Sequence, residues 1–455
     1  MADQSNFSGS IVIDSINLSK VRGAQGLNLT EGFINLELYE DILSPCLHGM
    51  MFLPDTQGKF SSSKIVGGEY LYIEYHSPEF PDDIMFGNFI VTSIKSKVPD
   101  GPSKFLMVLE FMSEIGYRSL HKKIPKLHKG NPVKLIRNIL LNDLSVDYSP
   151  TMLVNESPAE TDDDIQKLEG DFGEVSYMSS LDESPIEVIR SIASLMVDNS
   201  NAPNGQPVTG FYFFEGMKSG FELRSYSNLT GETYVDLTVE PDPETAAGGW
   251  DKVFYYDNNS GRDNGGKSLK QMMQQINKIT INKQFDMIPR LMMGAIGKKV
   301  VEFDVLGKKY GSPYTFDYEK DFESMDTMNQ YRINNSLAEV PNPTYRVSIH
   351  NTFNKAYDKA FVDMSINKTR TEQVHGMLAT SSIEVEIAGR TTLDVGTRVW
   401  VFVSNQVGAN PESGEPTVDK LLTGWYLVVT VKHMITPTSH SIVLKLVSDS
   451  YNLEI

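Results

Sequence analysis

The chain has 455 residues, of which 40% are hydrophobic and 22% charged, so it can bury several cores, and its length suggests about three domains. Its 41 basic and 59 acidic residues give a formal net charge of −18, which argues against a protein that grips nucleic acid through phosphate contacts. Cys46 is the only cysteine, which excludes an intrachain disulfide and indicates folding in a reducing compartment.

The first part of the chain is predicted to be all β. Residues 1–10 are polar and lack the apolar run of a signal peptide, so we expect assembly in a cytoplasm. Apolar residues then alternate with polar ones, as at Ile34, Leu36 and Leu38, and turn-rich pieces separate the runs. This spacing predicts an antiparallel β-barrel over residues 1–120, built from the runs 11–13, 32–41, 47–53, 70–75, 86–94 and 105–111.

The apolar pattern then becomes helical. At Asn131-Pro132 and again at Ser184-Pro185, a capping side chain precedes a proline at the first helical position. Helices are therefore predicted from each proline, and two strands follow over 210–215 and 221–226, joined by a linker of hairpin length. We expect a small α+β domain over residues 121–235.

An acidic stretch, residues 155–183, interrupts this domain. From Glu156 to Glu174 there are eight carboxylates and one lysine, with too few apolar groups to offset the entropy of ordering. We predict a solvent-exposed loop or insertion. Asp162, Asp163 and Asp164 are consecutive and lack the alternating ligand spacing of a calcium loop, so we interpret them as part of the solvated loop.

The remaining chain returns to β structure. A mixed β/α extension is predicted over residues 236–340, with a helix at 268–278. A second antiparallel barrel is predicted over 341–455, from the runs 344–351, 382–387, 397–403, 424–434 and 441–447. The fold class is therefore mainly β with an α+β insert: two antiparallel β-barrel (tail-tube-like) domains flank a small α+β region.

Motifs that carry chemistry are missing from the sequence. None of the eight histidines lies in a metal-binding helix motif or at metal-ligand spacing, and we interpret His433 as a half-exposed strand residue. A nucleophile elbow, a phosphate-cradling loop with its lysine and a dinucleotide fingerprint are also missing. We therefore predict no enzyme activity and name no catalytic, cofactor-binding or metal-ligating residue. A carboxylate pair for glycoside hydrolysis remains open, because among 59 acidic residues such a pair is formed only by folding.

A run of four aromatic residues, Phe211 to Phe214, makes both faces of one predicted strand apolar. Such a strand needs a cover on its second face. We expect the neighbouring helix at 185–197 to provide it, and the alternative is a second chain.

Three stretches of the sequence resemble the baseplate central hub proteins of contractile-tailed, T4-like phages. The first is the N-terminal strand pattern of 32–41, 47–52, 67–73 and 86–91. The second is the central unit from Ser184 to Leu223 with the block 294–318. The third is the C-terminal pattern of 387–397 and 422–428, in which Gly396 and Gly424 are expected at tight turns or close backbone approaches. These motifs are structural, so no catalytic residue is implied.

The resemblance implies a structural subunit of the virion tail baseplate. It implies a homotrimer in which each subunit gives two barrels, so that the ring adapts a threefold spike to a sixfold tail tube around the DNA channel. The expected partners are the tail spike protein, the tail tube or tube initiator protein, the tape measure protein and the baseplate wedge proteins. DNA is expected to pass without specific binding, no membrane-spanning segment is expected, and no cofactor is implied.

Two alternatives come from other classes. One is a tail-associated cell-wall glycan or peptidoglycan hydrolase, which needs an acid pair and a compact helical block. The other is a carbohydrate-binding tail protein, which predicts an exposed aromatic platform, whereas the hub predicts aromatics buried between chains.

Overall fold

The computed structural model describes part of the chain. The described residues are 8–56, 65–100, 104–144, 152–159, 161–168, 171–198, 209–231, 252–256, 269–284, 286–293, 297–304, 308–310, 314–317, 327–329, 331–332, 344–350, 369–378, 381–409 and 416–452.

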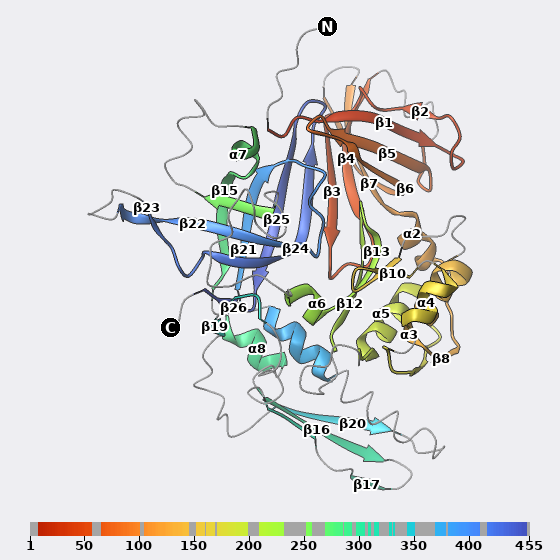
Figure 1. The fold of residues 1–455 in the computed structure, drawn as a ribbon. Helices are drawn as coiled ribbons and strands as arrows, with labels where there is room; N and C mark the ends of the chain where they lie inside the picture. The colour runs from red at the N-terminus through yellow and green to blue at the C-terminus, as the bar shows by residue number, and fades with distance from the viewer. Residues whose placement is uncertain are drawn as a thin grey trace.

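The fold is mainly β, as predicted, and one 14-stranded sheet joins the two ends of the chain (Figure 1). The N-terminal half supplies β1 (Val12–Ser19), β2 (Leu27–Asn28), β3 (Asn35–Asp41), β4 (His48–Thr56), β5 (Tyr70–Ser77), β6 (Phe80–Pro99) and β7 (Lys104–Ser113). The C-terminal half supplies β14 (Val253–Tyr256), β15 (Ile276–Lys283), β21 (Ser381–Ala388), β22 (Arg398–Ala409), β23 (Pro416–Val418), β24 (Gly424–Ile435) and β25 (His440–Ser448). The main path runs β15-β21-β25-β24-β3-β4-β7-β6-β5-β1-β2.

The two halves meet where β3 pairs with β24. The pairing is antiparallel and runs from Thr430 opposite Asp41 to Ile435 opposite Leu36. Along β3 buried and half-buried residues alternate, so one face of the strand packs on a core and the other faces outward. Each half has its own hydrophobic core, and the cores exchange residues at the junction: Ile42 packs in the C-terminal core and Ile435 in the N-terminal core.

The α+β unit predicted between the two halves is present. Its elements are α2 (Glu114–Leu120), β8 (Leu127–Gly130), α3 (Pro132–Asn138), a π-helical turn (Ile139–Asp143), β9 (Met152–Val154), β10 (Ser157–Pro158), α4 (Asp162–Leu168), β11 (Val175–Met178), α5 (Pro185–Leu195), β12 (Phe211–Gly216), β13 (Gly220–Ser225) and α6 (Tyr226–Thr230). Both predicted helix starts are confirmed: Asn131 accepts hydrogen bonds from the first turn of α3, and Ser184 forms a capping box with Glu187.

The prediction of a loop over the acidic stretch is wrong in part, because the described residues there include β10, α4 and β11. Thr161 and Asp164 bond reciprocally at the start of α4: the Thr161 amide donates to the Asp164 carboxylate, and the Asp164 amide donates to the Thr161 hydroxyl. Asp162, Asp163 and Asp164 thus lie in the first helical turn, where negative charge is favourable to the helix dipole.

The helix predicted over 268–278 is shorter than expected. It is α7 (Leu269–Met273), and the following residues form β15, which pairs with β21. The strand predicted at 344–351 is present as β20 (Thr344–His350), but it pairs with β16 (Gly297–Asp304) outside the shared sheet. Smaller elements complete the described chain: α8 (Met287–Met293), β17 (Lys309–Tyr310), β18 (Tyr314–Asp317), β19 (Tyr331–Arg332), β26 (Ser450–Tyr451) and a helix over 369–378.

The aromatic strand β12 is covered on both faces by its own chain. Phe211 and Phe213 belong to the core of the α+β unit together with apolar residues of α5, which confirms the expected helical cover. Tyr212 and Phe214 face the core of the C-terminal half, so β12 ties the α+β unit to the C-terminal half. The domain boundaries stay a prediction.

Candidate functional site

The candidate site is a surface of the shared sheet and the junction beneath it. Six adjacent strands, β21, β25, β24, β3, β4 and β7, form one hydrogen-bonded layer, with three strands from each half. We call the outward face of these six strands the wall. Alternate residues of each strand point to it, and in β3 these are Asn35, Glu37, Tyr39 and Asp41.

Charged side chains on the wall are paired across the β3–β24 junction. Lys432 of β24 lies 3.0 Å from the Glu37 carboxylate, and its ammonium group lies 5.3 Å from the ring centroid of Tyr39. Tyr39 donates to Glu37 and stacks on His48 of β4. Partial burial alone would raise the pKa of Glu37, but the hydrogen bonds from Tyr39 and Lys432 outweigh it and the pKa lies below its usual value.

The same pairing continues away from the junction. Lys445 of β25 lies directly opposite Glu384 of β21, so the two side chains share a face. Near the other end of the wall, Glu110 of β7 accepts from Lys95 of β6 at 2.8 Å. The wall therefore carries both signs of charge, and Asp41 of β3 and Glu386 of β21 add further carboxylates to it.

Beneath the junction lies a buried chain of titratable groups. Glu40 of β3 and His433 of β24 are both fully buried, and His433 Nε2 lies 2.8 Å from the Glu40 carboxylate. The other ring nitrogen, Nδ1, lies 2.9 Å from Nε2 of His440 in β25. The interpretation of His433 as half-exposed is wrong, because its side chain points to the core side of the sheet.

The α+β unit packs against this buried group of titratable side chains. The turn between β12 and β13 donates two backbone hydrogen bonds: Met217 N–H to Glu40 at 3.1 Å and Ser219 N–H to Asp394 at 3.2 Å. The Asp394 carboxyl also lies against that of Glu40. One buried cluster thus joins the N-terminal half, the C-terminal half and the α+β unit.

Burial disfavours charge on the groups of this cluster. Burial raises the pKa of Glu40 to about 7, and burial with the neighbouring Glu40 charge raises the pKa of Asp394 well above its usual range. Burial lowers the pKa of His433 to about 4, and burial likewise lowers the pKa of His440 well below its usual value. Two carboxyl groups in contact cannot both ionise at low cost, so one of them carries a proton. A protonated Glu40 donates to His433, which then donates through Nδ1 to His440.

Sequence reasoning missed this cluster, although one signal was present. Glu40 lies at every second position of β3 together with Leu36 and Leu38, so all three side chains share one face of the strand. The alternation that places the two leucines inward therefore also places the carboxylate inward. The partners of Glu40 carry no such signal. Among the described residues, no group of three or more His, Cys, Asp or Glu is arranged to hold a metal ion.

Both glycines singled out in the sequence lie at close approaches. Gly396 has φ +82°, a conformation that favours glycine, and packs on Phe214 of the α+β unit. A Cβ at Gly424 would lie 2.6 Å from Oδ1 of Asn329. Among the helices of the described chain, none is long and apolar enough to cross a membrane.

No family model matches this sequence, and no curated protein matches it either. Solved structures do. The chain is similar to a tail protein from Neisseria meningitidis MC58, with a TM-score of 0.51 over 96% of both chains at 10% sequence identity. It is also similar to the 43 kDa tail protein of prophage MuSo2 from Shewanella oneidensis, with a TM-score of 0.50 over 98% of this chain and 100% of that one at 11% identity. The fold of this chain is therefore one found in tail proteins, along nearly the whole length of each.

Proposed function

We propose that the chain is a non-enzymatic structural subunit of a phage tail baseplate and serves as its central hub. The observation that carries the proposal is the wall, to which the N-terminal and C-terminal halves each contribute three strands. The likeness to two tail proteins in fold supports the same assignment. In a homotrimer, three subunits with two similar halves each present six similar segments, which is the geometry needed to join a threefold spike to a sixfold tube.

In this proposal the wall lines the DNA channel. Lys432 on the wall is paired with Glu37, and Lys445 has Glu384 opposite it, so a phosphate would compete with these carboxylates for each lysine. DNA then passes without specific binding. The tail spike, the tube or tube initiator, the tape measure and the wedge proteins are the proposed partners at the ends and rim of the ring, in a virion assembled in the host cytoplasm.

Closure of the ring needs an edge strand, and β15 is suited to that role. It lies at one end of the sheet path, and within the described residues its strand partner is β21 alone. Most of its side chains are exposed, and Ile281 is 48% exposed. A strand with an unpaired edge offers backbone donors and acceptors to a neighbouring chain. We propose that β15 contacts the next subunit.

Native mass spectrometry of the purified chain tests the ring. The wild type should be trimeric, and Ile281→Glu should yield monomer, because a carboxylate would be buried at the contact. The matched control is Val21→Glu, since Val21 is 64% exposed and lies in the N-terminal half away from β15. A wild type that stays monomeric both alone and with its spike rejects the hub. A trimer that survives Ile281→Glu rejects the β15 contact only.

The hydrolase alternative has less support. Glu40, one of the two carboxyl groups in the cluster with a raised pKa, is fully buried and held by His433 and Met217, so a glycan cannot reach it. A cell-wall lysis assay with purified protein checks this. Clear lysis that is lost on replacement of a single carboxylate would overturn the structural role.

A further inference from the structure

The two halves of the shared sheet repeat one strand arrangement. In the N-terminal half, β3, β4, β6 and β7 come in that sequence order and lie side by side as β3-β4-β7-β6. In the C-terminal half, β15, β21, β24 and β25 lie as β15-β21-β25-β24. Each half thus places its first, second, fourth and third strands in a row, with antiparallel pairing throughout. A further strand, β5 or β22, pairs with the first part of the third strand.

The third strands, β6 and β24, match in detail. The Val91 carbonyl of β6 accepts from the Gly68 amide at 2.7 Å, and the Val428 carbonyl of β24 accepts from the Gly396 amide at 2.9 Å. Both glycines have positive φ, +85° and +82°. In both strands the ladder to the fourth strand skips one residue directly after the valine, which marks a β-bulge. Val91 and Val428 are therefore equivalent, and the residues after them correspond through their partners on the fourth strand.

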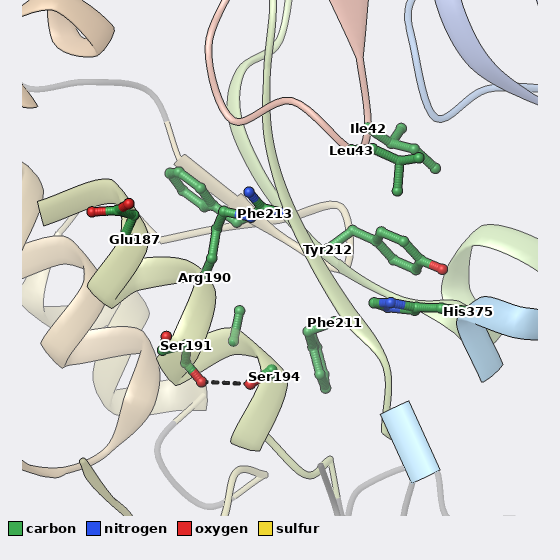
Figure 2. A pocket seen from close by; sticks show the side chains of 11 residues that line it. Ile42, Leu43, Glu187, Arg190, Ser191, Ser194, Phe211, Tyr212, Phe213 and His375 are labelled. Carbon is green, nitrogen blue, oxygen red and sulfur yellow. Dashed lines mark hydrogen bonds between the residues drawn. The ribbon is translucent and has the colours of Figure 1, made fainter. Parts of the chain in front are cut away.

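After the bulge, β24 forms the junction within the chain. Residues 430–435 pair with residues 36–41 of β3, the first strand of the other half. Just past β3, the Ile42 amide donates to the Val429 carbonyl at 3.0 Å. Figure 2 shows Ile42 on the side of β12 that carries Tyr212, and both side chains belong to the C-terminal core. The third strand of one half thus pairs with the first strand of the other, and the end of this junction is buried.

After the equivalent bulge, β6 keeps an open edge. Over residues 93–99 its strand partner within the described residues is β7 alone, because the pairing with β5 ends at Ile90. Ile94 is 39% exposed, whereas the equivalent Val431 of β24 is fully buried beside β3. Val98 is 53% exposed. This edge therefore offers backbone groups and apolar side chains to a further strand.

The matching edge is β15, the first strand of the C-terminal half. Ile281 of β15 is 48% exposed, whereas Leu38, at the equivalent position of β3, is 1% exposed. The equivalence follows from two lines of strand partners, which are Val91-Phe111-Gly49-Leu38 and Val428-Leu446-Ile383-Ile281. The end of the sheet path at β2 is a poorer partner, because β2 has only two residues, Leu27–Asn28.

We propose that β15 of one subunit pairs antiparallel with residues 93–99 of β6 in the next subunit, so that the contact between subunits repeats the β3–β24 pairing. The pairing rests on the proposed trimer and assigns its contact. A second bulge in β6, between Ile94 and Ser96, means that positions are counted along β7. The pair Glu37–Met434 within the chain then becomes Thr280 opposite Val98 between chains. A trimer has six like junctions, three within chains and three between them, and its sheet closes.

A disulfide between subunits tests the pairing. Thr280→Cys and Val98→Cys, both at exposed positions, are combined with Cys46→Ala, which removes the only native cysteine. Opposite residues of antiparallel strands have Cα atoms about 4.5–5.5 Å apart, within the range of about 4.4–6.8 Å that a disulfide spans. Within one subunit seven strand spacings, about 34 Å along the sheet, separate β15 from β6, so a bond must join two chains. Mild oxidation should give a covalent trimer on a non-reducing gel, and reduction should return it to monomer.

The matched control replaces Val98→Cys by Ser93→Cys. Ser93 lies on the same strand but four ladder positions away, about 13 Å along β6, and should not cross-link to position 280. A third pair, Thr280→Cys with Asn28→Cys, tests closure through β2 instead.

Native mass spectrometry of each reduced variant separates the pairing from the ring. A trimer that forms no Thr280–Val98 bond, or that cross-links as well through Ser93 or Asn28, overturns the β15–β6 pairing and leaves the hub standing. Where the wild type is trimeric only with its spike, the oxidation is carried out on that complex. A wild type that is monomeric both alone and with its spike rejects the hub and the pairing together.

Discussion

Replacement of Glu40 by glutamine should change how the protein's stability depends on pH. The carboxyl is fully buried, and its pKa is raised from 4.5 to about 7. A raised carboxyl pKa means that folding favours the protonated form. The cost of burying the charge is therefore absent below pH 4.5, grows as the pH rises, and is complete above about 7. At 1.36 kcal/mol per pH unit this cost amounts to about 3 kcal/mol.

Glutamine keeps the hydrogen bonds of the protonated acid, since its amide can donate to His433 and its carbonyl can accept from Met217. We therefore expect the wild type to lose about 2–3 kcal/mol relative to Glu40→Gln between pH 5 and pH 8. The comparison with the variant matters, because His433 has its pKa lowered to about 4 and favours folding as the pH rises over part of this window. Free energies of unfolding from denaturant titrations at each pH measure the difference.

The matched control is Glu37→Gln, on the same strand but on the wall. The pKa of Glu37 is lowered, so its contribution has the opposite sign: it is present above the unfolded pKa and is lost as the pH falls. If the stabilities of the wild type and Glu40→Gln change in parallel from pH 5 to pH 8, the reasoning is refuted. Glu40 would then be ionised in the folded protein already at pH 5, and folding would not raise its pKa.

Three further substitutions test the packing. Gly389→Ala should prevent correct folding of the junction, because a Cβ there would lie 2.1 Å from the ring of His440. Gly32→Ala is the control and should be tolerated, since the atom nearest to its Cβ would be 3.8 Å away. Circular dichroism and gel filtration distinguish a folded variant from a misfolded one. Ser184→Ala should cost about 1 kcal/mol through loss of the capping box, seen as a lower denaturation midpoint with an unchanged fold. Phe214→Ala should cost about 3–5 kcal/mol, because the side chain is fully buried between the α+β unit and the C-terminal half, and a loss below 1 kcal/mol would mean that the cavity collapses freely.

Local sequence rules predicted what depends on near neighbours. The caps at Asn131 and Ser184 and the alternation in β3 follow from short-range hydrogen bonding and side-chain direction, and they form as predicted. The same rules gave a partly wrong prediction for the acidic stretch, which they assigned to a loop. Its carboxylates indicate solvation by composition, but at Asp162 to Asp164 they start a helix, because position relative to the helix end decides their effect.

Long-range pairings could not be predicted from local pattern. β24 pairs with β3 although almost the whole sequence lies between them. The sequence of neither strand identifies the other as its partner. The same limit applies to the candidate site. The inward parity of Glu40 was available in the sequence, but its contacts with His433 and Asp394 exist only because three separate parts of the chain pack together.

The β3–β24 pairing also sets an order for folding during synthesis. Glu40 and His433 are 393 positions apart, so almost the entire chain must leave the ribosome before β3 gains its second neighbour. Until then the N-terminal half carries β3 as an exposed edge, which is open to wrong pairing. Contacts so distant in sequence make folding slow, because the chain loses the entropy of closing a long loop before strand pairing stabilises the structure. The last strands to be synthesised therefore complete the first part of the protein, and a chain truncated before residue 424 leaves its N-terminal half without that neighbour.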